Sequence, residues 1–225
     1  MKILLFGEHS AEIKTLAEKV GFEVVNENPE VVASYGGDGT FMKAESEFPG
    51  VPKLALKRSK ICKKCDDIPT EEILRKIFEG KYRVEKEIKI ESVFKDEKII
   101  GLNEIIVHNI DPRRAIRYET FVNDKRVNNE IIGDGVVIST PYGSTGYYRS
   151  ITDGIFEVGI GLAFNNSTEQ CDHIVLNDSS SIKLKIIRGP AMAYADNNET
   201  EIPLNDGDEI VIRKSEIVAN VIKLL

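Results

Sequence analysis

A glycine-rich turn near the N-terminus carries the residue best suited to chemistry. Residues 36–40 read Gly-Gly-Asp-Gly-Thr, between the apolar run 31–34 and a helical pattern. Glycines let a phosphate or sugar approach the backbone, and amides at a helix N-terminus bind anions. A carboxylate beside phosphates is unfavourable unless it accepts a hydroxyl proton or holds Mg²⁺. We therefore predict that Asp38 is catalytic, with Gly37 and Gly39 against the substrate; a tight turn with Asp38 near a helix cap is the simpler alternative.

Two further segments combine polar groups with apolar strands. Asn103 and Glu104 lie inside the apolar run 99–108, which predicts one strand. A buried amide and carboxylate are costly unless they meet a partner such as a ribose hydroxyl or a base edge. The alternative is an edge-strand pair that faces solvent.

The longest informative segment is 133–147, which reads Gly-Asp-Gly-Val-Val-Ile-Ser-Thr-Pro-Tyr-Gly-Ser-Thr-Gly-Tyr. It predicts a strand, a Pro-Tyr-Gly turn and a helix start with unpaired backbone donors. Tyr147 could stack on an adenine, Ser144 or Thr145 could bind its edge, and Asp134 could contact a ribose. A turn with a core tyrosine is the structural alternative.

In this order the three segments resemble the NAD kinase family, and the resemblance covers most of the chain. Lipid kinases and phosphofructokinases share the first loop, but lipid kinases lack the segment 133–147. The resemblance implies a transferase of NADP biosynthesis, which moves the γ-phosphoryl of ATP, with Mg²⁺, to the 2′-hydroxyl of the adenosine ribose of NAD. It also implies a Rossmann-like α/β domain followed by a β-sandwich, with the substrate in the cleft between them, and a homodimer or homotetramer.

The resemblance also implies residue roles. Asp38 would be the general base or the group that orients the acceptor hydroxyl. Asn103 and Glu104 would bind hydroxyl and base groups of NAD. The rest of the NAD pocket would consist of Asp134, Thr145, Gly146, Tyr147 and Ser150. We assign no metal-ligand residue of the chain.

The chain departs from the family pattern at residues 54–65, where a second glycine-rich stretch is expected. This segment has no glycine and five basic residues. We predict that Lys57, Arg58 and Lys60 bind phosphates; a solvated basic loop is the equal alternative.

The same segment holds the pair Cys62 and Cys65, a spacing found in metal and redox sites. A zinc site would need two more ligands, and Cys171, His173 and His9 are the candidates outside the apolar strand of His108. Three cysteines do not make a disulfide framework, so we expect unligated thiols.

The elements that position these residues change type near residues 81–86. Before this point strands and amphipathic helices alternate, which predicts a parallel sheet covered by helices. After it, strand-like runs separated by polar turns predict a mostly antiparallel half. We therefore expect an α/β domain at 1–84 and a β-sandwich that binds NAD at 85–225. The extreme C-terminus could pack back on the first domain.

Composition limits the classes of partner. The chain has 225 residues, 41% hydrophobic and 30% charged, with a net charge of −7. This balance argues against broad nucleic-acid binding, and no apolar run reaches the roughly 20 residues of a membrane span. We expect a cytoplasmic protein. Two alternatives stay open: a kinase of the same architecture with another nucleotide or a lipid as acceptor, and a non-catalytic dinucleotide-binding protein. The donor, the choice between NAD and NADH, and the oligomer size also stay open.

Overall fold

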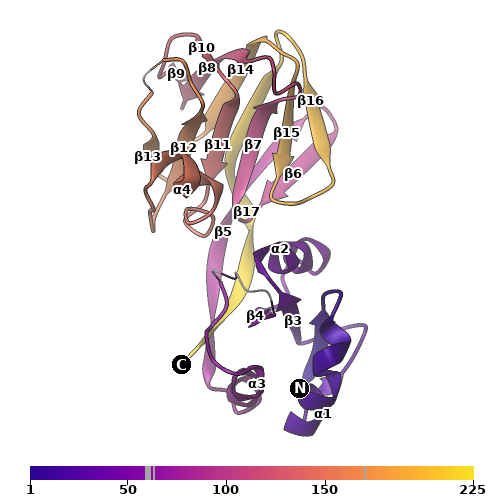
Figure 1. The fold of residues 1–225 in the computed structure, drawn as a ribbon. Helices are drawn as coiled ribbons and strands as arrows, with labels where there is room; N and C mark the ends of the chain where they lie inside the picture. Colours follow the sequence, from indigo (N-terminus) through magenta and orange to yellow (C-terminus); the bar gives the residue numbers. More distant parts are fainter. Residues whose placement is uncertain (59–61, 63, 170) are drawn as a thin grey trace. The chain divides into compact units, whose positions relative to one another are not determined.

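The chain forms two compact units in a computed structural model that describes residues 1–58, 62, 64–169 and 171–225. Unit 1 comprises Met1–Glu87 and Val218–Leu225, and unit 2 comprises Ile88–Ile217 (Figure 1). Strands β5 (Tyr82–Phe94) and β17 (Glu209–Leu224) each contribute residues to both units. The chain passes from one unit to the other within continuous strands, which explains why the sequence has no linker there.

Unit 1 contains a parallel sheet in the order β2-β1-β3-β4-β17. Its strands are β1 (Lys2–Phe6), β2 (Glu23–Val24), β3 (Val31–Gly36), β4 (Lys53–Lys57) and the end of β17. The alternation and helix spacing of the sequence predict this α/β arrangement, which is confirmed.

Helices cover both faces of this sheet. They are α1 (Lys14–Val20), preceded by the 3-10 turn Ser10–Ile13, then α2 (Asp38–Glu47) and α3 (Thr70–Phe78). One face packs Ile3 and Ala33 with residues of α1 and α3, and the other packs Leu4 and Val32 against Ala44 of α2. Because successive strand side chains point to opposite faces, a continuous apolar run such as β3 suits a sheet covered twice.

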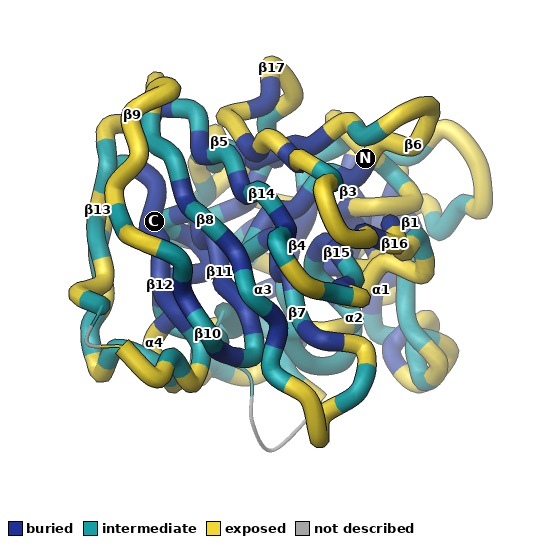
Figure 2. Tube along the Cα trace, turned by 90° about the horizontal axis from the view of Figure 1, so that it is seen from above, coloured by how far each residue is buried: buried dark blue, intermediate teal, exposed yellow. Residues whose placement is uncertain are grey.

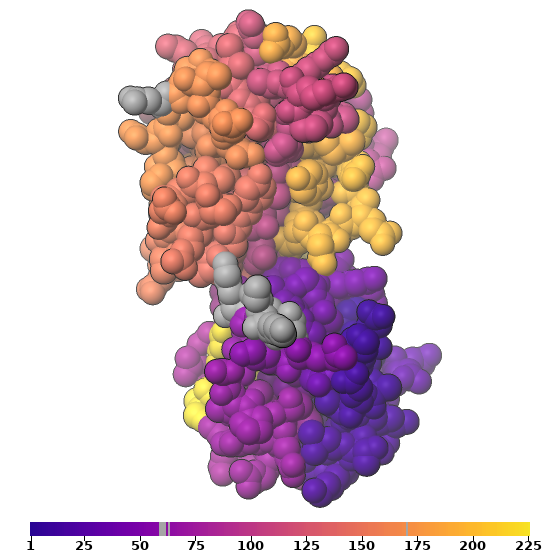
Figure 3. Space-filling view, viewed as in Figure 1, coloured from indigo at the N-terminus to yellow at the C-terminus, as the bar shows by residue number. Residues whose placement is uncertain are grey.

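The C-terminus of the chain belongs to unit 1. Val221 of β17 pairs in parallel with Lys53 of β4, and Ile222 lies in the unit 1 core. Leu225 accepts a hydrogen bond from Lys76 Nζ (3.0 Å) and donates its N–H to the carbonyl of Lys81 (3.2 Å). In Figure 3 the lower yellow atoms are these last residues, at the surface of the unit.

Unit 2 consists of two antiparallel sheets. One contains β5 and β17 with β6 (Glu97–Gly101), β8 (Ile116–Val122), β9 (Lys125–Arg126), β10 (Ile131–Gly133) and β14 (Ile182–Arg188). The other has the order β13-β12-β11-β7-β15-β16. Its strands are β7 (Glu104–Asn109), β11 (Gly135–Ser139), β12 (Ile160–Asn165), β13 (Ile174–Leu176), β15 (Ala191–Ala195) and β16 (Glu201–Leu204). A short helix, α4 (Tyr147–Thr152), follows the Pro-Tyr-Gly turn.

One apolar core joins the two sheets. It includes Ile116, Tyr118 and Leu184 from the first sheet, and Val136 and Leu162 from the second. Figure 2 shows the buried stretches, in dark blue, along β8, β11 and β12. The predicted β-sandwich is confirmed.

The predicted single strand over 99–108 is wrong. The chain makes two strands, β6 and β7, with a turn at Leu102 and Asn103. A Cβ at Gly101 would lie 2.5 Å from the carbonyl oxygen of Glu104, so this close turn requires glycine. The apolar run hides the turn because Leu102 itself is buried.

Within the described parts of the chain, no helix has both the length and the apolar character that a bilayer crossing needs.

Candidate active site

Asp38 is the first residue of α2, and Gly37 is its N-cap. The chain turns directly from β3 into this helix, so the carboxylate stands where helix amides carry partial positive charge. Gly36 makes the turn possible, because a Cβ there would lie 2.2 Å from Thr40 Oγ1. Gly39 is the second residue of α2. The loop therefore places a carboxylate and backbone amides together, the combination that sequence analysis predicts.

The carboxyl ends of the parallel strands β1, β3 and β4 gather at one edge of the unit 1 sheet. Gly7 follows β1 there with a φ of +122°, and a Cβ on it would lie 2.7 Å from the carbonyl oxygen of Tyr35. Lys57 ends β4, and the Arg58 N–H donates to the carbonyl of Gly36 (3.0 Å). The edge thus brings Asp38 into the same region of unit 1 as the basic segment that follows β4.

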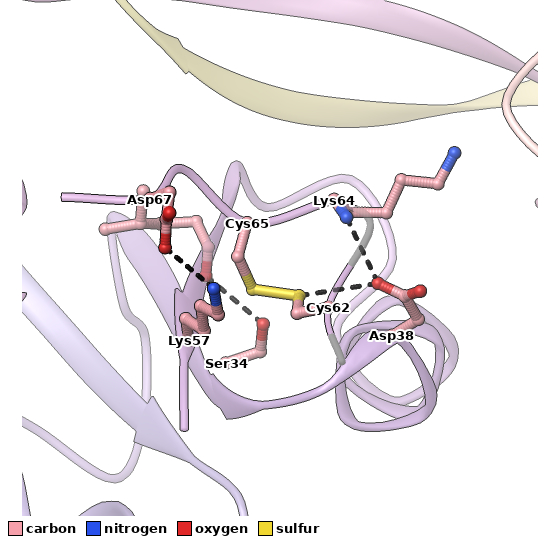
Figure 4. Close-up of a disulfide and its surroundings, with 8 residues drawn as sticks. Ser34, Asp38, Lys57, Cys62, Lys64, Cys65 and Asp67 are labelled. Atoms are coloured by element: carbon pink, nitrogen blue, oxygen red, sulfur yellow. Dashed lines mark hydrogen bonds and ion pairs between the residues drawn. A yellow bond between two sulfur atoms is a disulfide. The ribbon is translucent and has the colours of Figure 1, made fainter. Parts of the chain in front are cut away.

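The segment after β4 reaches Asp38 directly (Figure 4). The backbone N–H of Lys64 donates to Asp38 Oδ1 at 3.2 Å, and Cys62 Sγ lies 3.4 Å from the same oxygen. Cys62 and Cys65 form a disulfide. A disulfide sulfur carries no proton, so the contact between Cys62 and Asp38 is not a hydrogen bond from a thiol.

The expectation of unligated thiols at Cys62 and Cys65 is therefore wrong. Spacing alone cannot separate thiols, a metal site and a bridge, because the outcome depends on how the chain turns between the two residues. In the disulfide state neither sulfur is the thiolate that zinc requires. The remaining cysteine, Cys171, is a thiol in unit 2.

Lys57 and Arg58 both have carboxylate partners. Lys57 Nζ donates to Asp67 Oδ1 at 2.7 Å, and the Arg58 guanidinium makes two bonds of 3.1 Å to Glu12. These hydrogen bonds lower the pKa of Asp67 and of Glu12. Lys60, the third predicted phosphate ligand, lies outside the described residues. The structure thus shows the two cations as members of exposed ion pairs.

In unit 2, Asp196 fixes the turn that carries Asn103 and Glu104. Its carboxylate accepts the backbone N–H groups of Leu102 (2.7 Å), Asn103 (2.8 Å) and Glu104 (3.0 Å). The Asp196 N–H in turn donates to the carbonyl of Glu104 (3.0 Å). Burial raises the pKa of the Asp196 carboxyl, and the three amide donors oppose this shift. Sequence analysis missed Asp196, which lies 92 residues beyond Glu104 along the chain.

The same turn contacts the Pro-Tyr-Gly segment. The carbonyl of Asn103 accepts hydrogen bonds from the Thr140 N–H (2.8 Å) and from Ser139 Oγ (3.2 Å). A Cβ at Gly143 would lie 2.1 Å from that carbonyl oxygen, and one at Gly146 would lie 3.6 Å from Glu104 Oε2. The structure therefore brings Asn103, Glu104 and Gly146 together.

Asn103 keeps an unused acceptor. Its Oδ1 is buried and has no hydrogen-bond partner in the described part of the protein. An unsatisfied buried amide oxygen is unfavourable, so the site is suited to a ligand that supplies a hydroxyl or amine donor.

Tyr147, the first residue of α4, belongs to a chain of hydrogen bonds with Asn165 and His108. His108 Nδ1 lies 3.0 Å from the carbonyl oxygen of Asn109, which can only accept, so Nδ1 carries the ring proton. His108 Nε2 then accepts from Asn165 Nδ2 (3.2 Å), whose second hydrogen goes to Tyr147 Oη (2.9 Å). The phenol of Tyr147 accepts within the protein and retains its own proton for a ligand.

Asp134 lies between β10 and β11 and is held by two amides. Asn109 Nδ2 donates to Oδ1 (3.1 Å) and Asn166 Nδ2 donates to Oδ2 (2.9 Å). Asn165 and Asn166 are adjacent, so one pair of asparagines at the end of β12 orients both Tyr147 and Asp134. The consecutive asparagines in the sequence were the available signal, but nothing local distinguishes them from a polar turn.

The remaining predicted residues lie in or before α4. Ser150 Oγ donates to the carbonyl of Tyr147 (2.7 Å), and Ser144, buried, donates to the carbonyl of Pro141 (2.8 Å). Thr145 lies between Ser144 and Gly146 at intermediate burial. Tyr194 of β15 is a further neighbour that sequence analysis missed: burial, then the charges of Tyr147 and Glu104, raise its pKa. Unit 2 thus concentrates neutral donors and two carboxylates around the start of α4.

Comparison with known proteins gives a consistent match. The family described as the ATP-NAD kinase C-terminal domain matches residues 102–224. A bifunctional NADP phosphatase/NAD kinase of Methanocaldococcus jannaschii is 30% identical over 85% of this chain, which spans 36% of that protein. An NAD kinase of Methanothermobacter thermautotrophicus is 28% identical to this chain, and the match covers 91% of this chain and 75% of that protein.

A solved structure, an NAD kinase from Archaeoglobus fulgidus in complex with ATP, has the same fold. Its TM-score is 0.80 at 22% identity, over 100% of this chain and 92% of that one. The family match covers more than half of the chain and includes the Asn103 turn, Asp134, the Pro-Tyr-Gly segment and Asp196. The chain belongs to the NAD kinase family.

Proposed function

We propose that the chain is an ATP-dependent NAD kinase, which transfers the γ-phosphoryl of ATP to the 2′-hydroxyl of the adenosine ribose of NAD and yields NADP. The observation that carries the proposal is the Asp38 carboxylate at the start of α2, inside a glycine turn. A module that only binds a dinucleotide gains little from a carboxylate beside phosphates. The relative from Methanothermobacter thermautotrophicus, named an NAD kinase, supports this assignment.

The protein itself contributes little covalent chemistry to this reaction. The 2′-oxygen forms a bond to the γ-phosphorus, the bond from that phosphorus to the β,γ-bridging oxygen breaks, and ADP leaves. Asp38 orients the hydroxyl and accepts its proton. Positioning supplies most of the rate enhancement in phosphoryl transfer.

Mg²⁺ would accompany ATP and neutralise charge on its phosphates. Mg²⁺ keeps several waters and needs only one or two protein carboxylates beside substrate phosphates. Because Asp38 is assigned to the acceptor hydroxyl in this proposal, the phosphates of ATP and water would hold the ion. No group of three or more metal-binding side chains occurs among the described residues.

Unit 2 supplies the groups for NAD in this proposal. Asn103 offers its buried Oδ1 to a hydroxyl or amine of the dinucleotide. Tyr147 offers its phenol proton, and Glu104 and Asp134 offer carboxylates to ribose hydroxyls or base edges. The other proposed contacts are made by Thr145, Gly146 and Ser150 in unit 2 and by Gly37 and Gly39 in unit 1.

Tyr147→Phe should weaken NAD binding by about three- to tenfold, because it removes one hydrogen-bond donor and keeps the ring. Isothermal titration calorimetry with NAD measures the change. Tyr82→Phe, the same substitution in unit 1, is the matched control and should leave the dissociation constant unchanged. Equal affinities of the Tyr147→Phe variant and the parent would show that this phenol does not bind NAD.

Lys57→Ala combined with Arg58→Ala should raise the KM for ATP by about tenfold, while kcat changes less. Exposed ion pairs contribute only about 0–1 kcal/mol, so a triphosphate can displace Asp67 and Glu12 from these cations. Steady-state kinetics with varied ATP and saturating NAD tests this. KM values for both substrates that match the parent would remove the phosphate role and leave a solvated loop.

The assay that tests the function combines purified protein, ATP, Mg²⁺ and NAD, with an NADP-specific dehydrogenase as reporter. We expect NADP to accumulate. NAD binding by calorimetry without NADP would instead identify a non-catalytic dinucleotide-binding protein. If the protein neither binds NAD nor produces NADP, the acceptor to test next is another nucleotide or a lipid.

We further propose that the domains predicted at 1–84 and 85–225 correspond to units 1 and 2, with the extreme C-terminus packed on the first; the division of the chain near Glu87 supports this. We also propose a cytoplasmic protein, which the low cysteine content supports. The resemblance to the NAD kinase family supports a homodimer or homotetramer. Light scattering during size-exclusion chromatography determines the oligomer, and a monomer would refute that part.

A further inference from the structure

We propose that Cys62 and Cys65 form a redox site that controls Asp38: the disulfide holds the Lys64 amide on the carboxylate, and reduction by a dithiol releases it. The inference rests on the proposed catalytic role of Asp38. It assigns a use to the one motif of the sequence that the kinase function leaves unexplained.

The disulfide loop contacts the Asp38 carboxylate directly. Lys64 N–H and Cys62 Sγ both approach Oδ1 of Asp38, at 3.2 and 3.4 Å (Figure 4). An Oδ1 that already accepts an amide hydrogen has less room and fewer lone-pair directions for a substrate hydroxyl. The disulfide sulfur of Cys62 takes up further space beside the same oxygen. The oxidised loop therefore opposes the chemistry at Asp38.

Lys64 lies between Cys62 and Cys65, so the bond between the two sulfurs closes a ring that contains its amide. Reduction opens the ring and removes the covalent constraint that keeps this amide at Asp38.

The bridge between Cys62 and Cys65 adds little to the stability of the fold. Its cysteines are three positions apart, and a bridge across so short a loop constrains the unfolded chain little. A purely stabilising disulfide gains most from joining distant segments. The pattern Cys-x-x-Cys beside an α/β sheet is instead typical of thiol–disulfide exchange.

The exchange is balanced as a two-electron step. A dithiol attacks the bridge through one thiolate, and its second thiolate resolves the mixed disulfide. The dithiol becomes a cyclic disulfide, and Cys62 and Cys65 become thiols with the two protons it loses. An oxidised dithiol reverses the step.

The test compares the 225-residue protein after dithiothreitol and after oxidised dithiothreitol, each removed before assay. Intact-mass spectrometry counts the two hydrogens gained on reduction. We expect the reduced form to have a kcat for NADP formation about tenfold higher, the factor that loss of one hydrogen bond to a charged group produces. KM for ATP and NAD should change much less, since the effect falls on the reacting oxygen.

Two variants separate this site from other thiol effects. Cys62→Ser with Cys65→Ser should behave like the reduced protein under both treatments. Cys171→Ser, in unit 2, should respond to both treatments as the parent does. A double variant that still responds to oxidation would overturn the proposal.

The possible outcomes separate failure of the redox site from failure of the kinase function. Equal kcat in the two states, with the mass change confirmed, overturns the redox site and leaves the kinase intact. A faster oxidised form also overturns it. Absence of NADP in both states and in the double variant refutes the kinase function, and the redox control with it.

Discussion

Replacing Asp38 by Asn should lower kcat for NADP formation by about 10²- to 10⁴-fold, the range that a positioned general base contributes. The amide has nearly the same shape and still accepts the Lys64 N–H, but it cannot take up the proton of the 2′-hydroxyl. NAD binding should persist, because the groups assigned to NAD in unit 2 are unchanged. Initial rates with the NADP-specific reporter, together with calorimetry for NAD, measure both quantities.

Asp66→Asn is the matched control for this prediction. Asp66 is exposed, lies in the segment that follows the disulfide, and loses the same charge on substitution. It should retain the parent kcat within about twofold, as surface substitutions usually do. An Asp38→Asn protein that works as fast as Asp66→Asn would remove Asp38 from the reaction.

Replacing Asp196 by Ala should lower the free energy of unfolding by about 3 kcal/mol or more, because three backbone N–H groups lose their shared carboxyl acceptor. The turn at Asn103 should then lose its fixed conformation, and NAD affinity should fall with it. Urea unfolding measures the stability, and calorimetry of the folded protein measures the affinity.

Two further variants separate the effect of Asp196 on the Asn103 turn from a general loss of stability. Asp196→Asn keeps an acceptor and tolerates the left-handed backbone at this position (φ 49°), so it should be intermediate in both readouts. Asp206→Ala removes a carboxylate that holds one amide, that of Gly189 (2.7 Å), elsewhere in unit 2. It should leave NAD affinity unchanged. A stable Asp196→Ala protein with the NAD affinity of the parent would show that the Asp196 carboxyl group is not needed for NAD binding.

Most of the helices and strands can be predicted from the sequence because the residues that mark each of them are neighbours in the chain. Gly21 ends α1 in the left-handed conformation, at the glycine that marks the end of the helical period. β3, the glycine turn and α2 follow in the predicted order, since a buried strand and a helix have different apolar periods. The break between β6 and β7 was missed because its one signal, Gly101, stands inside an apolar run.

The candidate site is less accessible to sequence analysis, because its contacts join distant positions. Asp38, Asn103 and Tyr147 can be found from residue type and spacing. Asp196 and Asn165 cannot, since their roles depend on a turn and a helix that pack beside them only after folding. The Cys62 pair shows the opposite difficulty: the motif is plain in the sequence, but its chemical state depends on the local fold.

Transfer of the phosphoryl group to NAD can be followed directly by ³¹P NMR in a mixture of protein, ATP, Mg²⁺ and NAD. We expect the γ-phosphate signal of ATP to decline as ADP and a phosphomonoester signal appear in equal amounts, and the new signal to coincide with the 2′-phosphate of added NADP. The matching mixture with Asp38→Asn should show neither change. Loss of the γ-phosphate to inorganic phosphate, or a monoester that does not coincide with NADP, would refute the NAD kinase function.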